Sequence, residues 1–350
     1  MRVLVWQWGR RGGGPRYAVE LAEGLRQQPG VQVWLSLAAR AEILAQPGAP
    51  GCDWPVPTYA GWPGLLARWL GAPWMLVRLV RRLRQLAPLV AICAMPGPLD
   101  LVMALALRRV GCRLVVVVHD ATPHPGDGWP GQALLQRALL RRADRLVALS
   151  QHVADALARQ GFAGVHVSRH PPRSALPPPV PHDGPLRLLC YGRLLPYKGL
   201  DLLAAALARL GARADLRVRV VGAGPEAAAL AALRALPGVA VENRWVPEME
   251  MEALLAWADA VVLPYREASQ SGIAAAALSA GRHVLGTDVG GLRAQLDGIA
   301  GALCPPTAEG LAVGLRDLLE VRRFTPVPAL EPWRDWQAAL AALAVDLRRL

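Results

Sequence analysis

Short runs of apolar residues alternate along the whole chain with longer amphipathic stretches, and this alternation limits the fold more than any other feature. Runs such as Leu114–Val118 (LVVVV) are apolar at every position, which is typical of strands buried on both faces of a parallel sheet. Strands that alternate with helices predict a doubly wound α/β fold, because a crossover helix must join parallel neighbours. The sequence therefore predicts two Rossmann-like parallel-sheet domains, one in each half of the chain.

Each half contains a series of predicted strands separated by predicted helices. In the first half the strands are Val3–Trp6, Val31–Leu37, Leu89–Met95, Arg113–His119 and Leu146–Leu149, and the helices are Tyr17–Gln27, Trp74–Leu86, Leu99–Arg109, Gln132–Arg142 and His152–Gln160. In the second half the strands are Leu186–Tyr191, Leu216–Val221, Val239–Glu242, Ala260–Leu263 and His283–Gly286, and the helices are Gly199–Leu210, Glu226–Leu236, Glu248–Ala258, Ile273–Ala280 and Ala308–Val321. The segment Pro47–Pro73 is rich in Pro, Gly and Trp and gives no assignment.

A proline-rich stretch separates the two halves at residues 171–185. Seven of its fifteen residues are proline, so we expect a semi-rigid, extended linker. The predicted domains are residues 1–170 and residues 186–330, followed by a final segment, residues 331–350. Two such domains are expected to face a cleft, with the strand-to-helix turns of both sheets directed toward it.

Several classes of protein are excluded by what the chain lacks. It contains no run of 18 uncharged apolar residues, and its beginning does not resemble a signal peptide. The five cysteines form no CxxC pair, so neither a disulfide framework nor a zinc site is indicated. We therefore expect a cytoplasmic protein.

The stretch YGRLLPYKGLD, residues 191–201, contains Lys198, the only lysine among the 39 Lys and Arg residues. Lys198 lies between a predicted strand and a predicted helix, with Arg193 close by in sequence. The N-terminus of a helix presents unpaired N–H groups and the positive end of the helix dipole, and lysine and arginine both suit phosphate. Two solvated cations on a loop would give the same pattern, but we favour an anion site.

Two glycine-rich turns are further candidates for contact with a phosphate. The first, Gly12–Gly14, lets backbone N–H groups approach a ligand closely, although it does not match a Walker-type loop. The second, VVGAGPEAA, fits G-x-G-x-x-A through Gly222, with Glu242 twenty residues later. That spacing is the dinucleotide-binding fingerprint, but it occurs in the second turn of its domain. An NAD-dependent dehydrogenase is therefore a weaker alternative.

The turn PYREASQSGI, residues 264–273, leads into an alanine-rich predicted helix. Ser271, Gly272 and Ile273 are expected to provide the first N–H groups of that helix, which again suit phosphate. An alanine helix buried against the sheet is compatible with this interpretation.

His119 and Asp120 end a buried strand and are followed by His124 and Asp127. Catalytic groups gather at the carboxyl ends of strands in α/β proteins, so His119 is predicted to contact a sugar hydroxyl or to transfer a proton. A metal site formed by these His and Asp residues is a weaker alternative, because no fourth ligand is evident.

With these motifs in place, the chain resembles family 4 of the retaining glycosyltransferases, which have the GT-B fold. The segment YGRLLPYKGLDLLAAALARL resembles the G-R-x-x-x-x-K-G element of the family, and VVGAGPEAAALAAL resembles its G-x-G-P/E helix start. The segments ADAVVLPY and AGRHVLGTDVGGL resemble those that flank its donor site, and the resemblance is strongest from Leu186 to Leu292. It implies a UDP- or GDP-linked sugar donor on the C-terminal domain, an acceptor on the N-terminal domain, and reaction without an essential metal or cofactor.

The resemblance also implies roles for individual residues. Arg193 and Lys198 would bind the donor diphosphate, His119 would contact the donor sugar near its reacting carbon, and the last helix would pack back on the N-terminal domain. Trp333 and Trp336 would anchor that helix. The donor-binding set so implied consists of Gly13, Gly14, Gly192, Gly222, Glu242, Val246 (near the base), Tyr265, Ser271, Gly272 and Ile273.

One departure from the family concerns its pair of glutamates in E-G-F-G-x-x-x-x-E. These positions fall on Ala268 and Ala276, and the chain has ASQSGIAAA there, similar to a subgroup with a [ST]-Q-S-G signature. Glu267 is one residue out of register. Both carboxylates that would hold donor hydroxyls are thus missing.

These observations predict a hexosyltransferase-type glycosyltransferase (EC 2.4 class) with a retaining mechanism. We expect it to act on a lipid-linked or glycan acceptor in bacterial cell-surface polysaccharide or glycolipid synthesis. The alternatives are a GT-B-type nucleotide-sugar epimerase and a non-catalytic nucleotide-sugar binder.

The charge of the chain is unevenly distributed. Residues 1–180 contain 21 arginines and nine acidic residues, which accounts for the whole formal charge of +12. The predicted helix Trp74–Leu86 has Arg78, Arg81 and Arg82 opposite its apolar face, and Trp62 and Trp69 precede it. Further arginines occur at 108, 109, 137, 141, 142 and 145. Because no nucleic-acid motif is present, we expect the N-terminal domain to bind an anionic membrane surface and the protein to be peripheral on the inner face of the cytoplasmic membrane.

Overall fold

The structure, a computed structural model, describes residues 1–126, 128, 131–168, 171, 182–299, 302–321 and 332–349, without the side chains of residues 248, 321 and 332–335. The predicted linker therefore lies largely outside the described residues, as does the side chain of Trp333. Contacts divide the chain into two units: unit 1 contains Met1–Pro123, Trp129–Pro171 and Trp333–Leu350, and unit 2 contains His124–Gly128 and Pro172–Pro332. This division differs from the predicted boundaries at His124–Gly128, which belongs to unit 2.

Unit 1 is built on a six-stranded parallel sheet with the strand order β2-β1-β3-β4-β5-β6. Its strands are β1 (Arg2–Gln7), β2 (Gln32–Leu37), β3 (Val90–Cys93), β4 (Arg113–Val118), β5 (Arg145–Ala148) and β6 (His166–Val167). Its helices are α1 (Gly13–Arg26), η1 (Glu42–Ala45), α2 (Gly61–Leu70), α3 (Ala72–Leu86), α4 (Asp100–Arg109), α5 (Gln132–Leu140), α6 (Gln151–Arg159) and α13 (Pro332–Arg348). The strand order reverses between β1 and β3, which is where ligands bind in open α/β sheets.

Unit 2 is built on a second six-stranded parallel sheet, with the strand order β12-β11-β10-β7-β8-β9. Its strands are β7 (Leu186–Tyr191), β8 (Leu216–Gly222), β9 (Val239–Asn243), β10 (Ala260–Leu263), β11 (His283–Thr287) and β12 (Leu303–Cys304). Its helices are η2 (Pro196–Lys198), α7 (Leu200–Leu210), α8 (Ala228–Arg234), α9 (Glu248–Trp257), α10 (Gly272–Ser279), α11 (Gly290–Leu296) and α12 (Ala308–Val321). The reversal point here lies between β7 and β10.

The predicted fold class, two doubly wound parallel sheets, is therefore confirmed. The apolar run in β4 shows why: Leu114, Val116 and Val118 join the hydrophobic cluster on one face of the sheet, and Val115 and Val117 join the cluster on the other. Because the side chains of a strand alternate between its faces, a continuous apolar run fills both layers.

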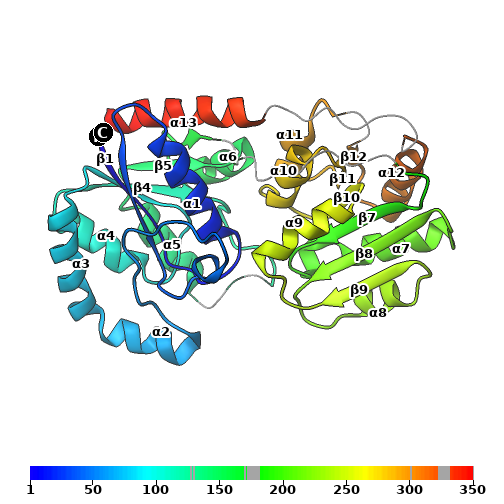
Figure 1. The fold of residues 1–350 in the computed structure, drawn as a ribbon, viewed down its shortest axis with the longest axis horizontal. Coiled ribbons are helices and arrows are strands. Elements are labelled where there is room, and N and C mark those ends of the chain that lie inside the picture. Colours follow the sequence, from blue (N-terminus) through cyan, green and yellow to red (C-terminus); the bar gives the residue numbers. More distant parts are fainter. Residues whose placement is uncertain are drawn as a thin grey trace. The chain divides into compact units, whose positions relative to one another are not determined.

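Helix α13 returns to unit 1 and completes the hydrophobic cluster that contains α1 (Figure 1). Trp336 and Leu340 are buried in that cluster. Gly24 on α1 permits this contact, because a Cβ added there would lie 2.2 Å from Leu340 Cδ1. The last helix is thus anchored by direct packing against α1.

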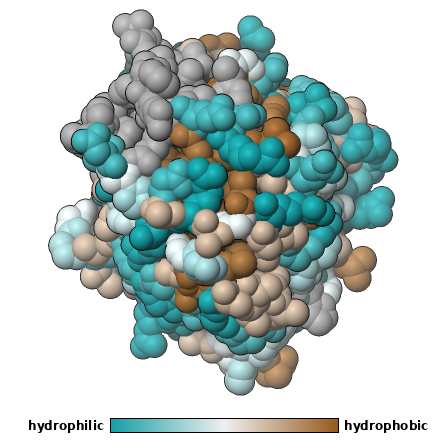
Figure 2. Space-filling view, turned by 90° about the vertical axis from the view of Figure 1, so that its right-hand side faces the viewer, coloured by the Kyte–Doolittle hydropathy of each residue, from teal (hydrophilic) through white to brown (hydrophobic). Residues whose placement is uncertain are grey.

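The surfaces of the two units differ in where large apolar side chains are exposed. The face of unit 2 toward the viewer in Figure 2 is mostly hydrophilic, with small separate hydrophobic areas. In unit 1, by contrast, α2 and α3 contain six of the fourteen large hydrophobic side chains that are exposed among the described residues. No helix in the described part of the chain is both long and apolar enough to cross a bilayer.

Candidate functional site

The turns that follow β7 and β8 pack backbone against backbone at the carboxyl edge of the unit 2 sheet. Gly192 and Gly222 have positive φ angles of 130° and 156°. A Cβ at Gly222 would lie 1.7 Å from the carbonyl oxygen of Gly192, and one at Gly224 would lie 2.2 Å from that of Leu194. The glycines of the apparent dinucleotide fingerprint are therefore required for the contact between two neighbouring turns.

Lys198 lies against the end of β10, directly at the reversal point of the sheet. Lys198 is the last residue of the short helix η2, and the next residue, Gly199, has a φ of 65°. Gly199 also lies close to the end of β10, because a Cβ at this position would lie 1.8 Å from the carbonyl oxygen of Pro264. Lys198 Nζ lies 3.7 Å from the centroid of the Tyr265 ring and 5.0 Å from that of Tyr197. The ammonium group is therefore held at the edge of the sheet by cation–π contacts.

Arg193 belongs to the same cluster. Its guanidinium donates a hydrogen bond from Nη2 to the hydroxyl oxygen of Tyr197 at 3.4 Å, and its charge also acts on Tyr265. The Tyr265 hydroxyl is 3.4 Å from Ser271 Oγ. Burial raises the pKa of Tyr265 well above its ordinary value, so this phenol stays neutral at physiological pH.

The N-terminus of α10 adjoins Tyr265, but its hydrogen bonds differ from the prediction. Ser271 Oγ accepts a hydrogen bond from the N–H of Ala274 at 3.3 Å, which makes Ser271 the N-cap. The N–H of Ser271 itself donates to Gln295 Oε1 at 2.9 Å, so this N–H is paired within the protein, and the contact of Ser271 with a donor remains a prediction. The first-turn N–H groups of Gly272 and Ile273 have no partner within the helix and remain candidates for an anion.

Glu242 lies outside this cluster, and Val246 belongs to the apolar packing behind it. Glu242 is the second-last residue of β9, which β8 separates from β7. Its carboxylate accepts hydrogen bonds from Arg219 (2.5 Å) and Arg244 (2.8 Å). The Arg219 bond, followed by the Arg244 bond, lowers the pKa of Glu242 against the effect of burial. Val246 is buried in the apolar cluster that also contains Tyr265. Their predicted roles toward the donor remain predictions.

The two positions of the missing glutamates are occupied by buried alanines, Ala268 and Ala276. The neighbouring carboxylate, Glu267, is engaged instead by His124, whose Nδ1 lies 2.8 Å from Glu267 Oε1. The His124 ring stacks on Tyr197 at a centroid separation of 4.5 Å and an interplanar angle of 13°. The described residues contain no group of three His, Cys, Asp or Glu side chains placed to hold a metal ion.

The sequence did not point to Tyr197, and it placed His124 only in a possible metal site. The two residues come from distant parts of the chain, and Tyr197 is surrounded by His124, Lys198 and Arg193. The signal that was present in the sequence is the aromatic residue directly before the only lysine. The ring of this aromatic residue, Tyr197, contacts both the ammonium group of Lys198 and the imidazole of His124.

The candidate residues of unit 1 gather at the carboxyl ends of β1 and β4. His119 follows β4, is buried, and has its Nε2 2.9 Å from the carbonyl oxygen of Ala94. Its ring meets Tyr17 edge to face, with centroids 4.7 Å apart. Tyr17 lies on α1, whose first residues are Gly13 and Gly14, so the glycine turn and His119 are linked through one helix.

The glycine turn after β1 is filled by a side chain of that strand. Gln7 is buried, and its Oε1 accepts a hydrogen bond from the N–H of Gly9 at 2.8 Å. A Cβ at Gly14 would lie 2.8 Å from Gln7 Nε2 and 3.1 Å from Met95 Sδ. A side chain at position 14 would thus displace Gln7 and Met95, and the contact of Gly13 and Gly14 with a donor remains a prediction.

Two family models match the two halves of the chain. Residues 11–172 match Glycosyltransferase Family 4, and residues 185–321 match Glycosyl transferases group 1. The chain resembles the glycogen synthase of Mycobacterium tuberculosis (strain H37Rv), to which it is 29% identical over 225 residues, covering 59% of this chain and 54% of that protein. It is 30% identical over 297 residues to the D-inositol 3-phosphate glycosyltransferase of Streptomyces coelicolor, covering 66% of this chain and 64% of that one.

Among solved structures, HepE from Anabaena, crystallised in complex with UDP-glucose, has a TM-score of 0.74 to this chain at 18% identity. That similarity covers 100% of both chains, and at this identity it concerns the fold alone. The chain spans about half the length of the curated relatives that it matches first.

The two sheets and the matched models together define a two-domain transferase of the GT-B type. More narrowly, the Glycosyltransferase Family 4 model matches unit 1 and the Glycosyl transferases group 1 model matches unit 2, so each unit resembles one part of these glycosyltransferases.

Proposed function

We propose that the protein transfers a sugar from a nucleoside diphosphate sugar, most simply a UDP-sugar, and that unit 2 binds the diphosphate. The observation that carries this proposal is the position of Lys198 and Arg193 at the reversal point between β7 and β10. Ligands of open α/β sheets bind at such points. The structural neighbour HepE was solved with UDP-glucose, which supports a UDP-linked donor.

The chemistry of glycosyl transfer needs stabilisation of a departing diphosphate. Lys198 and Arg193 supply positive charge. The N–H groups of Gly272 and Ile273 lie at the N-terminus of α10, which is the positive end of the helix dipole. Preorganised groups of this kind act without reorganisation as charge develops, and removing one of them costs on the order of a hundredfold in rate. His119 is proposed to contact the donor sugar, and the retaining outcome is part of the proposal.

The test is a screen of UDP- and GDP-sugars with the purified chain. Each is followed for slow hydrolysis, for transfer to lipid-linked and glycan acceptors, and for conversion to an isomeric nucleotide sugar. Transfer with retention at the anomeric carbon is expected. An isomeric nucleotide sugar formed without acceptor would establish an epimerase instead, and tight binding with no turnover would establish a non-catalytic binder.

We further propose that the protein works on a lipid-linked acceptor in cell-surface polysaccharide or glycolipid synthesis, peripheral on the inner face of the cytoplasmic membrane. The supporting feature is the outer surface of α2 and α3, where Trp62 is 60% exposed, Leu70 77% and Trp74 76%. Exposed aromatic residues with this spacing suit the interface between lipid and water.

Basic residues lie beside this apolar surface. Arg78 and Arg81 on α3 are exposed, while Leu79, Val80, Leu83 and Leu86 of the same helix are buried against unit 1, as the helical pattern predicts. Each basic residue near an anionic leaflet contributes about 1 kcal/mol of binding free energy. The α2–α3 surface thus combines groups that insert into a membrane with groups that attract its charge.

Sedimentation with vesicles tests the membrane proposal. Binding is expected to require anionic lipid, to weaken with salt, and to fall when Trp62 and Trp74 are both replaced by Ser. The matched control is Trp245→Ser, which removes a 39% exposed tryptophan from unit 2. Equal binding to neutral vesicles, or no difference between the double variant and the control, would reject the α2–α3 surface as the docking site.

A further inference from the structure

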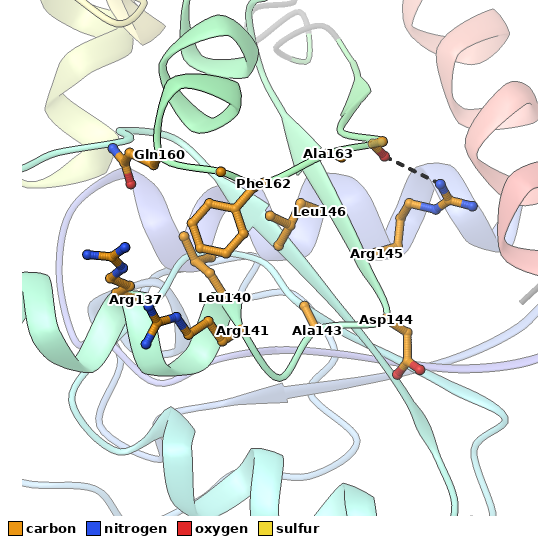
Figure 3. Close-up of a pocket in the computed structure, with 12 residues that line it drawn as sticks. Arg137, Leu140, Arg141, Ala143, Asp144, Arg145, Leu146, Gln160, Phe162 and Ala163 are labelled. Atoms are coloured by element: carbon orange, nitrogen blue, oxygen red, sulfur yellow. Dashed lines mark hydrogen bonds between the residues drawn. The ribbon is translucent and has the colours of Figure 1, made fainter.

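A groove lies between α5 and α6 of unit 1, formed by two adjoining cavities. One has a volume of about 420 Å³ and is shown in Figure 3, and the other has a volume of about 410 Å³. Both are lined by Arg137, Leu140 and Gln160, so they lie next to each other on the same part of unit 1. We call this feature the α5–α6 groove.

The groove is lined by four arginines and a single acidic residue, Asp144. Asp144 is engaged elsewhere, because its two oxygens accept hydrogen bonds from Arg113 (2.8 Å) and from the N–H of Leu114 (2.7 Å). Arg145 is engaged too, by Asp346 at 3.2 Å and by the carbonyl oxygen of Gly164, the bond drawn in Figure 3.

The other three arginines, Arg137, Arg141 and Arg159, have no carboxylate of the described residues within salt-bridge distance. Arg137 lies in the last turn of α5 and Arg141 is its C-cap, one helical turn further on, so the two positive charges lie on the same side of the helix end. A site that concentrates positive charge in this way fits an anionic ligand, and arginine matches the geometry of phosphate oxygens.

The floor of the groove is apolar. Phe162 lies at the centre of the cavity in Figure 3, between Leu140 and Leu146, with Arg137 and Arg141 at one side. All three apolar residues belong to, or pack on, the main hydrophobic cluster of that face of the sheet. A ligand that fits this lining therefore carries a phosphate next to an apolar portion.

One end of the groove lies close to His119. The lining includes Ala121 and Pro123, which are two and four residues after His119 in the chain. Four residues span at most about 14 Å, so the Pro123 backbone lies within that distance of the His119 backbone. The segment is fixed by Gln160 Nε2, which donates to the carbonyl oxygen of Ala121 at 3.2 Å.

We propose that the α5–α6 groove binds the phosphate or diphosphate group of the acceptor, with Arg137, Arg141 and Arg159 as its ligands and Phe162 beneath the adjoining apolar portion. This inference rests on the proposed function, in which unit 1 takes the acceptor. It names the acceptor class: a phosphorylated amphiphile rather than a neutral glycan.

Inorganic pyrophosphate is the probe, and calorimetric titration is the measurement. The titration uses the full chain in an Arg193→Gln, Lys198→Gln background, so that the candidate donor site of unit 2 does not contribute. Adding Arg137→Gln and Arg141→Gln is expected to weaken pyrophosphate binding at least about tenfold, because charge-assisted hydrogen bonds are lost. The matched control is Arg142→Gln, since Arg142 is exposed, donates to the carbonyl oxygen of Ala138, and does not line the groove.

Pyrophosphate affinity that is unchanged by the groove substitutions, or that falls equally in the control, overturns the proposal. A second arm uses vesicles that contain phosphatidylglycerol. If the groove substitutions weaken vesicle binding and leave pyrophosphate binding intact, the arginines serve as a general lipid-charge surface, and the proposal also fails. If pyrophosphate binding follows the groove arginines while no nucleotide sugar is turned over by the unsubstituted chain, the phosphate site is upheld and the proposed function is what fails.

Discussion

Replacing Lys198 by Gln removes the ammonium group at the reversal point of the unit 2 sheet and keeps most of the aliphatic side chain. The structure sets a bound on the cost to stability. Lys198 Nζ makes a cation–π contact at 3.7 Å from the Tyr265 centroid, and such contacts contribute about 0.5–2 kcal/mol. A loss of 1 kcal/mol lowers the melting temperature of a domain of this size by about 2–4 °C.

The expected effect on the reaction is larger. If Lys198 stabilises the departing diphosphate, its loss is expected to lower kcat by about 100- to 1,000-fold, or about 2.7–4 kcal/mol in activation free energy. The catalytic cost therefore exceeds the folding cost, and the variant remains folded while it is nearly inactive. The same reasoning applies to Arg193→Gln.

The assay combines initial rates for the donor found by the nucleotide-sugar screen with thermal unfolding of the same samples. Arg209→Gln is the matched control, because Arg209 is exposed near the end of α7 and removes one positive charge from the same unit. A Lys198→Gln enzyme with kcat within threefold of the wild type would refute the role assigned to Lys198. A fall in activity that only matches the unfolded fraction would do the same.

Three further predictions concern the fold that positions the site. Gly222→Ala should destabilise unit 2 by several kcal/mol in denaturant unfolding, because its Cβ would lie 1.7 Å from a carbonyl oxygen. The control Gly211→Ala has no atom within 4 Å of its Cβ and should cost only about 1–2 kcal/mol for its positive φ, and equal costs would contradict this account. Trp336→Ala should cost about 3–5 kcal/mol in the same measurement because Trp336 is 1% exposed, and Trp74→Ala, at 76% exposure, should cost under about 0.5 kcal/mol. Burial raises the pKa of Asp100 to about 6 from 3.8, so the folded state holds its proton more tightly than the unfolded chain. Relative to Asp100→Asn, wild-type stability should therefore fall by about 2–3 kcal/mol as pH rises from about 4 to about 6 and stay level above that; a difference that does not change with pH would contradict it.

Much of the fold followed from the sequence because buried parallel strands leave a continuous apolar signal. All ten predicted strands are present, with bounds that differ by at most two residues at either end. The strands that were missed, β6 and β12, are two residues long and too short to carry a periodic pattern. Helix α2 was missed for a different reason: Trp62, Leu66 and Leu70 are exposed, so its apolar pattern does not follow the rule that hydrophobic side chains face the core.

The residues of the site could be predicted only where they lie close together in the sequence. Lys198 and Arg193 were found because a strand-to-helix turn places charge at a sheet edge. The contacts that orient them were not, since His124 reaches Glu267 across 143 positions and Gln295 reaches Ser271 across 24. Hydrogen bonds over such separations leave no periodic or compositional trace, and one of them takes up the N–H of Ser271 that the sequence had assigned to a ligand.

The loss of the family's two glutamates has a consistent physical consequence at this edge of the sheet. Ala276 is fully buried in an apolar cluster, where a carboxylate without a partner would be strongly destabilising. The acidic side chains that do remain near Lys198 are engaged by other residues, Asp201 by the guanidinium of Arg266 and Glu267 by the imidazole of His124. Two unit charges 4 Å apart interact by about 4 kcal/mol at an effective dielectric constant near 20. Under the proposed function we therefore expect Lys198 and Arg193 to contribute more to binding the diphosphate of a donor than to binding the hydroxyls of its sugar.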